Sequence, residues 1–124
     1  MADNYEKATI QPSFPQQIVD AHLDKLQNLG VKIFNETPKP GFAYLCIPDG
    51  CWDWDELHNT LQEMLAGADM KYCYVEGAMY CDKMIANEFG GFAHFITKDD
   101  IQFCNTGSWV MKREAEVNTG DQKL

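Results

Sequence analysis

Two tryptophans lie among three carboxylates in segment 51–56, which reads CWDWDE. Tryptophan dominates the energetics of protein interfaces, and fixed carboxylates attract basic partners, so this pattern indicates an interaction site. The same residues also suit structural roles. Asp53 has the position of a helix cap, Trp54 of a core residue, and the remaining acids meet the positive end of a helix dipole. Both interpretations place the start of a helix here.

Negative charge is concentrated around this segment. The chain of 124 residues has 19 acidic side chains against 10 lysines and arginines, a net charge of −9. Between Lys39 and Lys71 neither lysine nor arginine occurs. We therefore expect one acidic face that binds a basic protein partner. Its predicted partner-binding residues are Asp49, Trp52, Asp53, Asp55, Glu56 and Glu63. Direct nucleic-acid binding is not expected, because it needs clustered lysine and arginine.

Thiols and imidazoles are the next candidates for chemistry. They are Cys46, Cys51, Cys73, Cys81 and Cys104, with His58 and His94. No Cys-x-x-Cys or His-x-x-x-His spacing occurs among them, so we predict neither a metal site nor a cofactor. A cysteine nucleophile with His94 as its base would need direct contact and a lowered thiol pKa, which spacing does not reveal. Scattered cysteines are typical of small core residues.

A pocket near the aromatic segment 92–104 is the alternative site. In this interpretation the protein is a small-molecule-binding or enzymatic domain, with the pocket between that segment and a helix over 54–66. The residues predicted to line it are Tyr72, Tyr74, Glu76 and His94. The chain has no Walker loop, no Gly-x-Gly-x-x-Gly and no Gly-x-Ser-x-Gly, so no motif identifies a reaction. Exposure of several aromatic residues in the C-terminal half would favour a homodimer or a partner-binding face.

Hydrophobic periodicity predicts the elements that must position these residues. Helical spacing predicts two main helices, over 15–29 and 54–66, and we expect a short third helix over 78–86. Alternation and turn residues predict a hairpin of strands 31–34 and 42–47, a strand over 70–75, and a second hairpin of strands 92–97 and 101–104. Residues 1–12 read as an irregular N-terminal arm, 13–111 as a single domain, and 112–124 as a frayed polar tail.

The expected fold is therefore a small α+β domain with an antiparallel sheet of about four to five strands. Neither a membrane span nor a signal peptide is visible, so we expect a cytoplasmic protein with reduced thiols. The absence of a catalytic motif favours a non-enzymatic interaction protein, for example a phage or mobile-element inhibitor that blocks the basic nucleic-acid site of a host defence protein.

Overall fold

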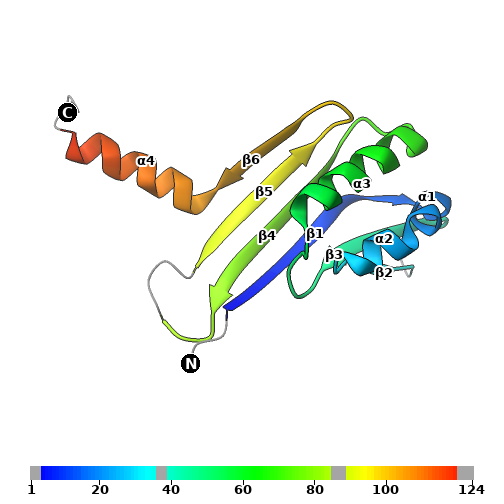
Figure 1. The fold of residues 1–124 in the computed structure, drawn as a ribbon, viewed down its shortest axis with the longest axis horizontal. Coiled ribbons are helices and arrows are strands. Elements are labelled where there is room, and N and C mark those ends of the chain that lie inside the picture. The colour runs from blue at the N-terminus through cyan, green and yellow to red at the C-terminus, as the bar shows by residue number, and fades with distance from the viewer. Residues whose placement is uncertain (1–3, 36–38, 85–88, 120–124) are drawn as a thin grey trace.

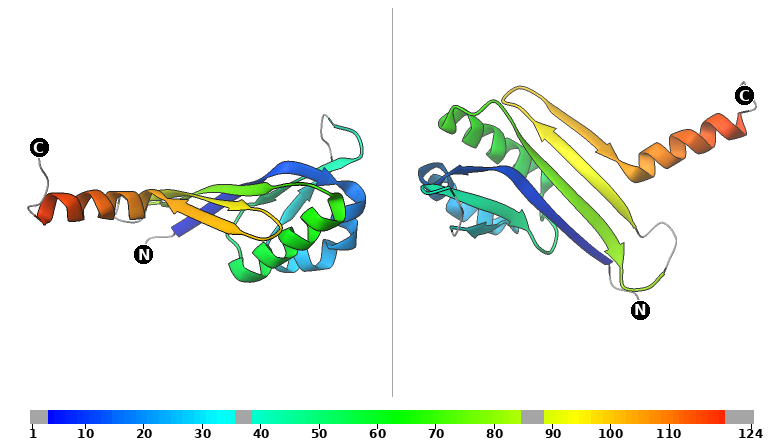
Figure 2. Two further views of the ribbon diagram at one scale, coloured as in Figure 1. Left: turned by 90° about the horizontal axis from the view of Figure 1, so that it is seen from above. Right: turned by 180° about the vertical axis from the view of Figure 1, so that it is seen from behind.

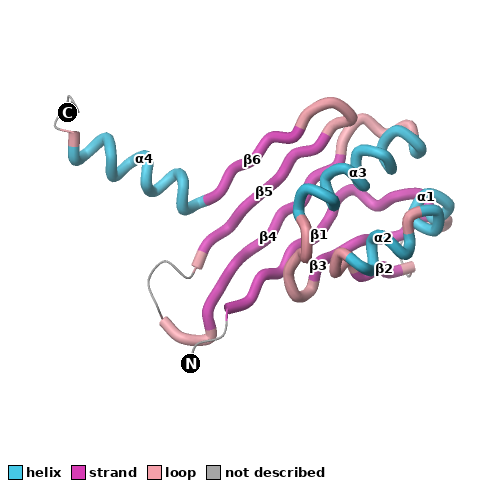
Figure 3. Tube along the Cα trace, in the orientation of Figure 1, coloured by secondary structure: helices cyan, strands magenta, loops and turns pink. Residues whose placement is uncertain are grey.

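One antiparallel sheet of six strands forms the centre of the fold, as seen in a computed structural model that describes residues 4–35, 39–84 and 89–119 (Figure 1). The strands are β1 (Asn4–Pro15), β2 (Lys32–Phe34), β3 (Phe42–Ile47), β4 (Cys73–Cys81), β5 (Gly90–Ile96) and β6 (Ile101–Asn105). Their spatial order is β2-β3-β1-β4-β5-β6, and Figure 3 shows the strands side by side in magenta. The α+β class is confirmed, and the sheet has six strands where about four to five were expected.

Three of the four helices cover one face of this sheet. They are α1 (Gln16–Ala21), α2 (Leu23–Asn28) and α3 (Trp54–Ala68). The fourth, α4 (Thr106–Asn118), continues from β6 and projects beyond the sheet (Figure 2). No helix in the described part of the chain is long and apolar enough to cross a membrane.

The core lies between this covered face and the helices. Its largest fully buried side chains include Ile10 and Phe14 from β1, Leu45 and Ile47 from β3, and Leu57, Leu61, Met64 and Leu65 from α3. Strand β3 alternates strictly between half-buried and buried residues, as expected for a strand packed on one face. The two predicted hairpins are confirmed by the antiparallel pairing of β2 with β3 and of β5 with β6.

The expectation of an irregular arm over residues 1–12 is wrong. Residues 4–15 form β1, which lies inside the sheet and pairs with both β3 and β4. Of residues 5–10, only Ala8 and Ile10 are buried, and the exposed Lys7 and Thr9 alternate with them. The apolar residues of this strand therefore alternate with polar ones that lie on the other face of the sheet, which makes the strand pattern weak in the sequence.

The expected helix over 78–86 is also wrong where the structure describes it. Ala78 pairs with Lys7 of β1 and with Gly91 of β5, so β4 continues to Cys81. Two strand neighbours satisfy the backbone groups that a helix would otherwise pair internally. Residues 85 and 86 lie outside the described residues.

The helix predicted over 15–29 is interrupted, whereas the one predicted over 54–66 is confirmed as α3. His22 separates α1 from α2 with a non-helical backbone, φ −118° and ψ 15°. Its ring Nδ1 donates to the carbonyl oxygen of Ile18 at 2.9 Å, a local bond that competes with regular helix pairing.

The predicted polar tail begins as a helix. Residues 112–118 belong to α4, which starts where the Asn105 side chain accepts a hydrogen bond from the Ser108 N–H at 2.6 Å. No residue of α4 is buried. The last residues, 120–124, lie outside the described part of the chain.

Tyrosine gathers on the face of the sheet opposite the three helices, here called the open face. All five tyrosines of the chain lie there: Tyr5, Tyr44, Tyr72, Tyr74 and Tyr80. Tyr5 stacks on Tyr80 with ring centroids 5.1 Å apart, and Tyr72 stacks on Phe95 at 5.3 Å. Strand alternation accounts for this sorting, because Cys73 and Val75 of β4 point into the core.

Candidate functional site

Helix α3 places two rings against the sheet. Its first turn is fixed by Asp53, whose side chain accepts a hydrogen bond from the Glu56 N–H at 3.1 Å, as the spacing predicted. Trp54 and His58 are four residues apart and therefore share one face of the helix. Their ring centroids lie 6.1 Å apart, and both rings lie over β5.

Strands β5 and β6 supply three more rings on the same face. Phe92 and His94 are two residues apart in β5 and therefore share a face of the sheet. Phe103 of β6 lies directly opposite His94 in the strand register. Gly77 of β4 makes room for Phe92, because a Cβ at that glycine would lie 2.6 Å from the phenyl ring. The close approach of Phe92 to the β4 backbone thus depends on the missing side chain.

His94 is the centre of this ring cluster. Its centroid lies 4.9 Å from those of Trp54, His58 and Phe103, with interplanar angles of 75–76°. His58 Nε2 and His94 Nδ1 are 3.0 Å apart, so one ring nitrogen donates a proton and the other accepts it. This hydrogen bond is compatible with two neutral imidazoles. Protonation of the accepting nitrogen would break it, because both facing nitrogens would then carry a hydrogen.

Burial keeps both imidazoles neutral at neutral pH. Desolvation lowers the pKa of His94 to about 4, and the neighbouring His58 acts in the same direction. Desolvation also lowers the pKa of His58, partly offset by the carboxylate of Asp55. His58 is only 4% exposed, which explains the sign of its shift.

These rings line a pocket of about 300 Å³, here called the histidine pocket. Its lining residues are Glu6, Trp54, Asp55, His58, Met79, Phe92, His94 and Phe103. Glu6 comes from β1, Met79 from β4, and Asp55 from the first turn of α3. The pocket joins the two sites expected from sequence, since Asp55 belongs to the predicted acidic face and His94 to the predicted pocket.

The predicted acidic residues have several environments. Asp49, Asp55 and the 82%-exposed Trp52 lie at the surface beside the start of α3. Asp53 is the helix cap. Glu56 pairs with Lys25 at 3.1 Å, and Glu63 lies 3.8 Å from His22. We call the exposed residues Asp49, Trp52 and Asp55 the acidic surface.

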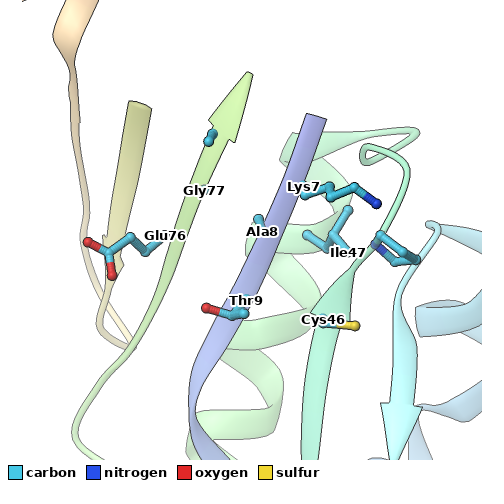
Figure 4. Close-up of a pocket in the computed structure, with 9 residues that line it drawn as sticks. Lys7, Ala8, Thr9, Cys46, Ile47, Glu76 and Gly77 are labelled. Atoms are coloured by element: carbon cyan, nitrogen blue, oxygen red, sulfur yellow. The ribbon is translucent and has the colours of Figure 1, made fainter. Parts of the chain in front are cut away.

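Three of the four residues predicted to line the pocket are absent from it. Tyr72, Tyr74 and Glu76 lie on the open face, because the residues between them point into the core. Glu76 borders a separate hollow of about 440 Å³ that also includes Lys7, Thr9 and Cys46. Figure 4 shows the Glu76 and Lys7 side chains directed away from each other there. Because Val75 points into the core, strand alternation places Tyr74 and Glu76 on the opposite face of the sheet from Val75 and from its partner His94.

Glu6, Met79 and Phe103 were not predicted as site residues. Glu6 and Met79 fall in the two segments whose strand character was missed, and they meet through the pairing of β1 with β4. His58 was considered only as a metal ligand. Its position four residues after Trp54 was the available signal, because that spacing puts both rings on the sheet-facing side of a helix.

The cysteines lie away from the histidine pocket. None lines it among the described residues, and Cys104 lies on the open face, on the other side of the sheet from His94. Burial raises the pKa of the Cys73 thiol to about 12, which opposes thiolate formation. In residues 4–35, 39–84 and 89–119, no group of three histidine, cysteine or carboxylate side chains is placed to hold a metal ion.

No protein-family model, no curated protein and no solved structure matches the chain. The fold and the site together define an α+β domain with a ring-lined, acid-rimmed pocket.

Proposed function

We propose that the protein is a non-enzymatic interaction protein that binds a basic protein partner through the acidic surface. The observation that carries the proposal is the exposure of Asp49, Trp52 and Asp55 together at the start of α3. An exposed tryptophan flanked by carboxylates supplies both a hot-spot side chain and a field that attracts cations.

The charge balance of this region supports the proposal. Lys25 pairs with Glu56, which offsets part of the negative charge along α3. Among the described residues, no ion pair involves Asp49 or Asp55. A basic partner would therefore meet carboxylates whose charge is not already compensated. The free cysteines of the described chain suit a reducing compartment such as the cytoplasm.

Nucleic-acid-binding proteins are one source of such a partner, because their binding sites are basic. A phage or mobile-element protein of this kind would act as an inhibitor by covering the site of a host defence protein. The proposal requires only the basic surface, and affinity capture from the native cell identifies the protein that carries it.

Charge reversal tests the proposal. The variant D49K/D55K leaves the Asp53 cap and the Lys25–Glu56 pair in place, so the fold should be kept. The matched control, D99K/D100K, makes the same charge change in the turn between β5 and β6. Affinity capture from the native cell at low and high salt should recover a basic protein with wild type and control. The recovery should fall with salt and with D49K/D55K.

Recovery of the same proteins by wild type and D49K/D55K, at both salt concentrations, would refute this function.

The second candidate function is small-molecule binding in the histidine pocket. Its volume of about 300 Å³ lies at the lower end of the range for small-ligand sites, and its rings supply an apolar lining. A small molecule that co-purifies with the protein, and is lost on mutation of Phe103, would favour this candidate.

A further inference from the structure

We propose that the histidine pocket binds an organic cation of the alkylammonium class, such as a lysine or methylated-lysine side chain. The inference rests on the proposed function only for the source of that cation, which would be a side chain of the basic partner. The pocket chemistry itself is independent of the partner, because a free ammonium ion presents the same group.

Aromatic walls are the first support. Trp54 meets Phe92 at a centroid distance of 5.7 Å and an interplanar angle of 80°, and it meets His94 at 76°. The steep angles show that these rings meet edge to face and do not form one flat stack, and Trp54, Phe92 and His94 all line the pocket beside them. A cation next to the face of such rings is attracted by their quadrupoles, and tryptophan is the strongest of these partners.

Carboxylates are the second support. Glu6 and Asp55 line the pocket from different elements, β1 and α3. Neither lysine nor arginine lines it in the described part of the chain. The fixed charge around the space is therefore negative, and it complements an ammonium group while opposing a carboxylate or phosphate.

Access is the third support. Phe103 is 62% exposed and Met79 is 44% exposed, so the pocket opens to solvent beside β6 and β4. His58 is almost fully buried at its inner end. A flexible alkylammonium chain that enters beside Phe103 and Met79 would bring its charge next to the rings without displacing a core residue.

The histidine pair makes the proposed binding depend on pH. At neutral pH both imidazoles are uncharged, because burial lowers both pKa values. The charged groups that line the space are Glu6 from β1 and Asp55 from α3, while β4, β5 and β6 contribute Met79, Phe92, His94 and Phe103. Protonation of His94, with its pKa of about 4, adds a positive charge in the pocket and weakens cation binding.

A titration of the full chain with tetramethylammonium chloride tests the inference by nuclear magnetic resonance. The neutral control ligand is neopentyl alcohol, which has a similar shape. We expect tetramethylammonium to shift the Trp54 indole and the His94 ring signals, and neopentyl alcohol to shift them much less. The dissociation constant should rise about two- to fivefold in D55N and F103A, the effect of losing one exposed cation–π or charge contact.

Two matched variants control for general damage. F95A removes a half-exposed phenylalanine from the open face of β5, the strand next to β6, and D99N removes a carboxylate from the β5–β6 turn. Both should bind tetramethylammonium as wild type does. Equal shifts with both ligands, or no shift at the pocket signals with tetramethylammonium, would overturn the inference.

The two proposals fail separately. If tetramethylammonium binds but no basic protein is captured in a salt-sensitive way, the pocket chemistry stands and the interaction function falls. If a basic protein is captured but tetramethylammonium leaves the pocket signals unchanged, the partner is held by the acidic surface and the pocket inference falls.

Discussion

Helices α3 and α4 start in the same way and differ in how they pack. Each begins with a side chain that accepts a hydrogen bond from the N–H three residues on, Asp53 in α3 and Asn105 in α4. Their lengths are similar, 15 and 13 residues. Six residues of α3 are buried and none of α4. A cap therefore defines where a helix starts, whereas packing provides most of its stability.

Exposed apolar residues set α4 apart further. Trp109, Val110, Met111 and Val117 are all at least about half exposed. In α3 the corresponding apolar residues repeat every three to four positions and reach the sheet. The first residue of α4, Thr106, accepts a hydrogen bond from the Gly91 N–H of β5 at 3.0 Å, and no residue of the helix is buried. Helix α4 therefore depends mainly on interactions within itself, and isolated helices of its length are marginal in water. Equivalent substitutions in the two helices should consequently have very different effects on stability.

Truncation of a buried residue in α3 should have the largest effect. Leu61→Ala removes a side chain with no exposed surface, and we expect the free energy of unfolding to fall by about 3 kcal/mol. Val117→Ala in α4 should change it by less than about 0.5 kcal/mol. Urea unfolding monitored by circular dichroism measures both. A comparable loss in Val117→Ala would show that α4 packs on the rest of the protein.

Acidification should destabilise the α3 side of the sheet through the histidine pair. The folded-state pKa of His94, about 4, lies below its unfolded value near 6.5. The unfolded chain therefore takes up a proton first as the pH falls, so stability is complete above about 6.5 and declines towards 4. We expect a loss of about 2 kcal/mol, allowing for the partial exposure of His94.

Replacement of His94 by glutamine checks that assignment. The H94Q variant cannot titrate in this range, so the decline of stability between pH 6.5 and 4 should become shallower than in wild type. Unfolding in urea at a series of pH values measures the slope. An unchanged slope in H94Q would assign the pH dependence to other groups.

Removal of the two caps should separate the helices more finely. Asp53→Ala is expected to lower the free energy of unfolding by about 1 kcal/mol, because α3 unfolds together with the core. Asn105→Ala should leave that value nearly unchanged and reduce helicity, because α4 can fray alone. Hydrogen exchange of the α4 amides, fast in wild type and faster in Asn105→Ala, gives the second readout. If the amides of α4 were protected from exchange as strongly as those of α3, the expected difference in stability between the two helices would be wrong.

Trp109→Ala should have the smallest effect on stability. Its ring is 63% exposed and contacts the Arg113 guanidinium at 5.7 Å within α4 itself. We expect the free energy of unfolding to change by less than about 0.5 kcal/mol. The part of the emission that Trp109→Ala removes should be readily quenched by acrylamide, and it is taken as the difference between wild type and variant because Trp52 is also 82% exposed. Strong shielding of this tryptophan at high protein concentration would mean that a second molecule covers α4.

The sequence predicted the elements with strong local signals. The cap at Asp53 and the spacing of Leu57, Leu61 and Leu65 identified α3, and alternation with turn residues identified both hairpins. Strand β1 was missed because Lys7 and Thr9, on the open face, dilute its apolar pattern. Helix α4 was missed because its apolar residues have no core-facing rhythm, although Asn105 and Ser108 have the spacing of a cap.

The site was predictable only in part, for a different reason. His94 and the acids near Trp54 were found as separate candidates, since each stands in a recognisable local pattern. Their convergence depends on the packing of α3 across β5, and Glu6 joins them only through the pairing of β1 with β4. Contacts between segments far apart in the chain leave no local pattern, so the sequence alone could not assemble the pocket.

The location of all five tyrosines on the open face has a practical consequence. A reagent that nitrates phenols can nitrate tyrosine only on that face of the sheet, whereas the histidine pocket on the other side contains no phenol. Protection of Tyr5, Tyr44 or Tyr74 in a footprinting experiment would therefore report which side of the protein another molecule approaches.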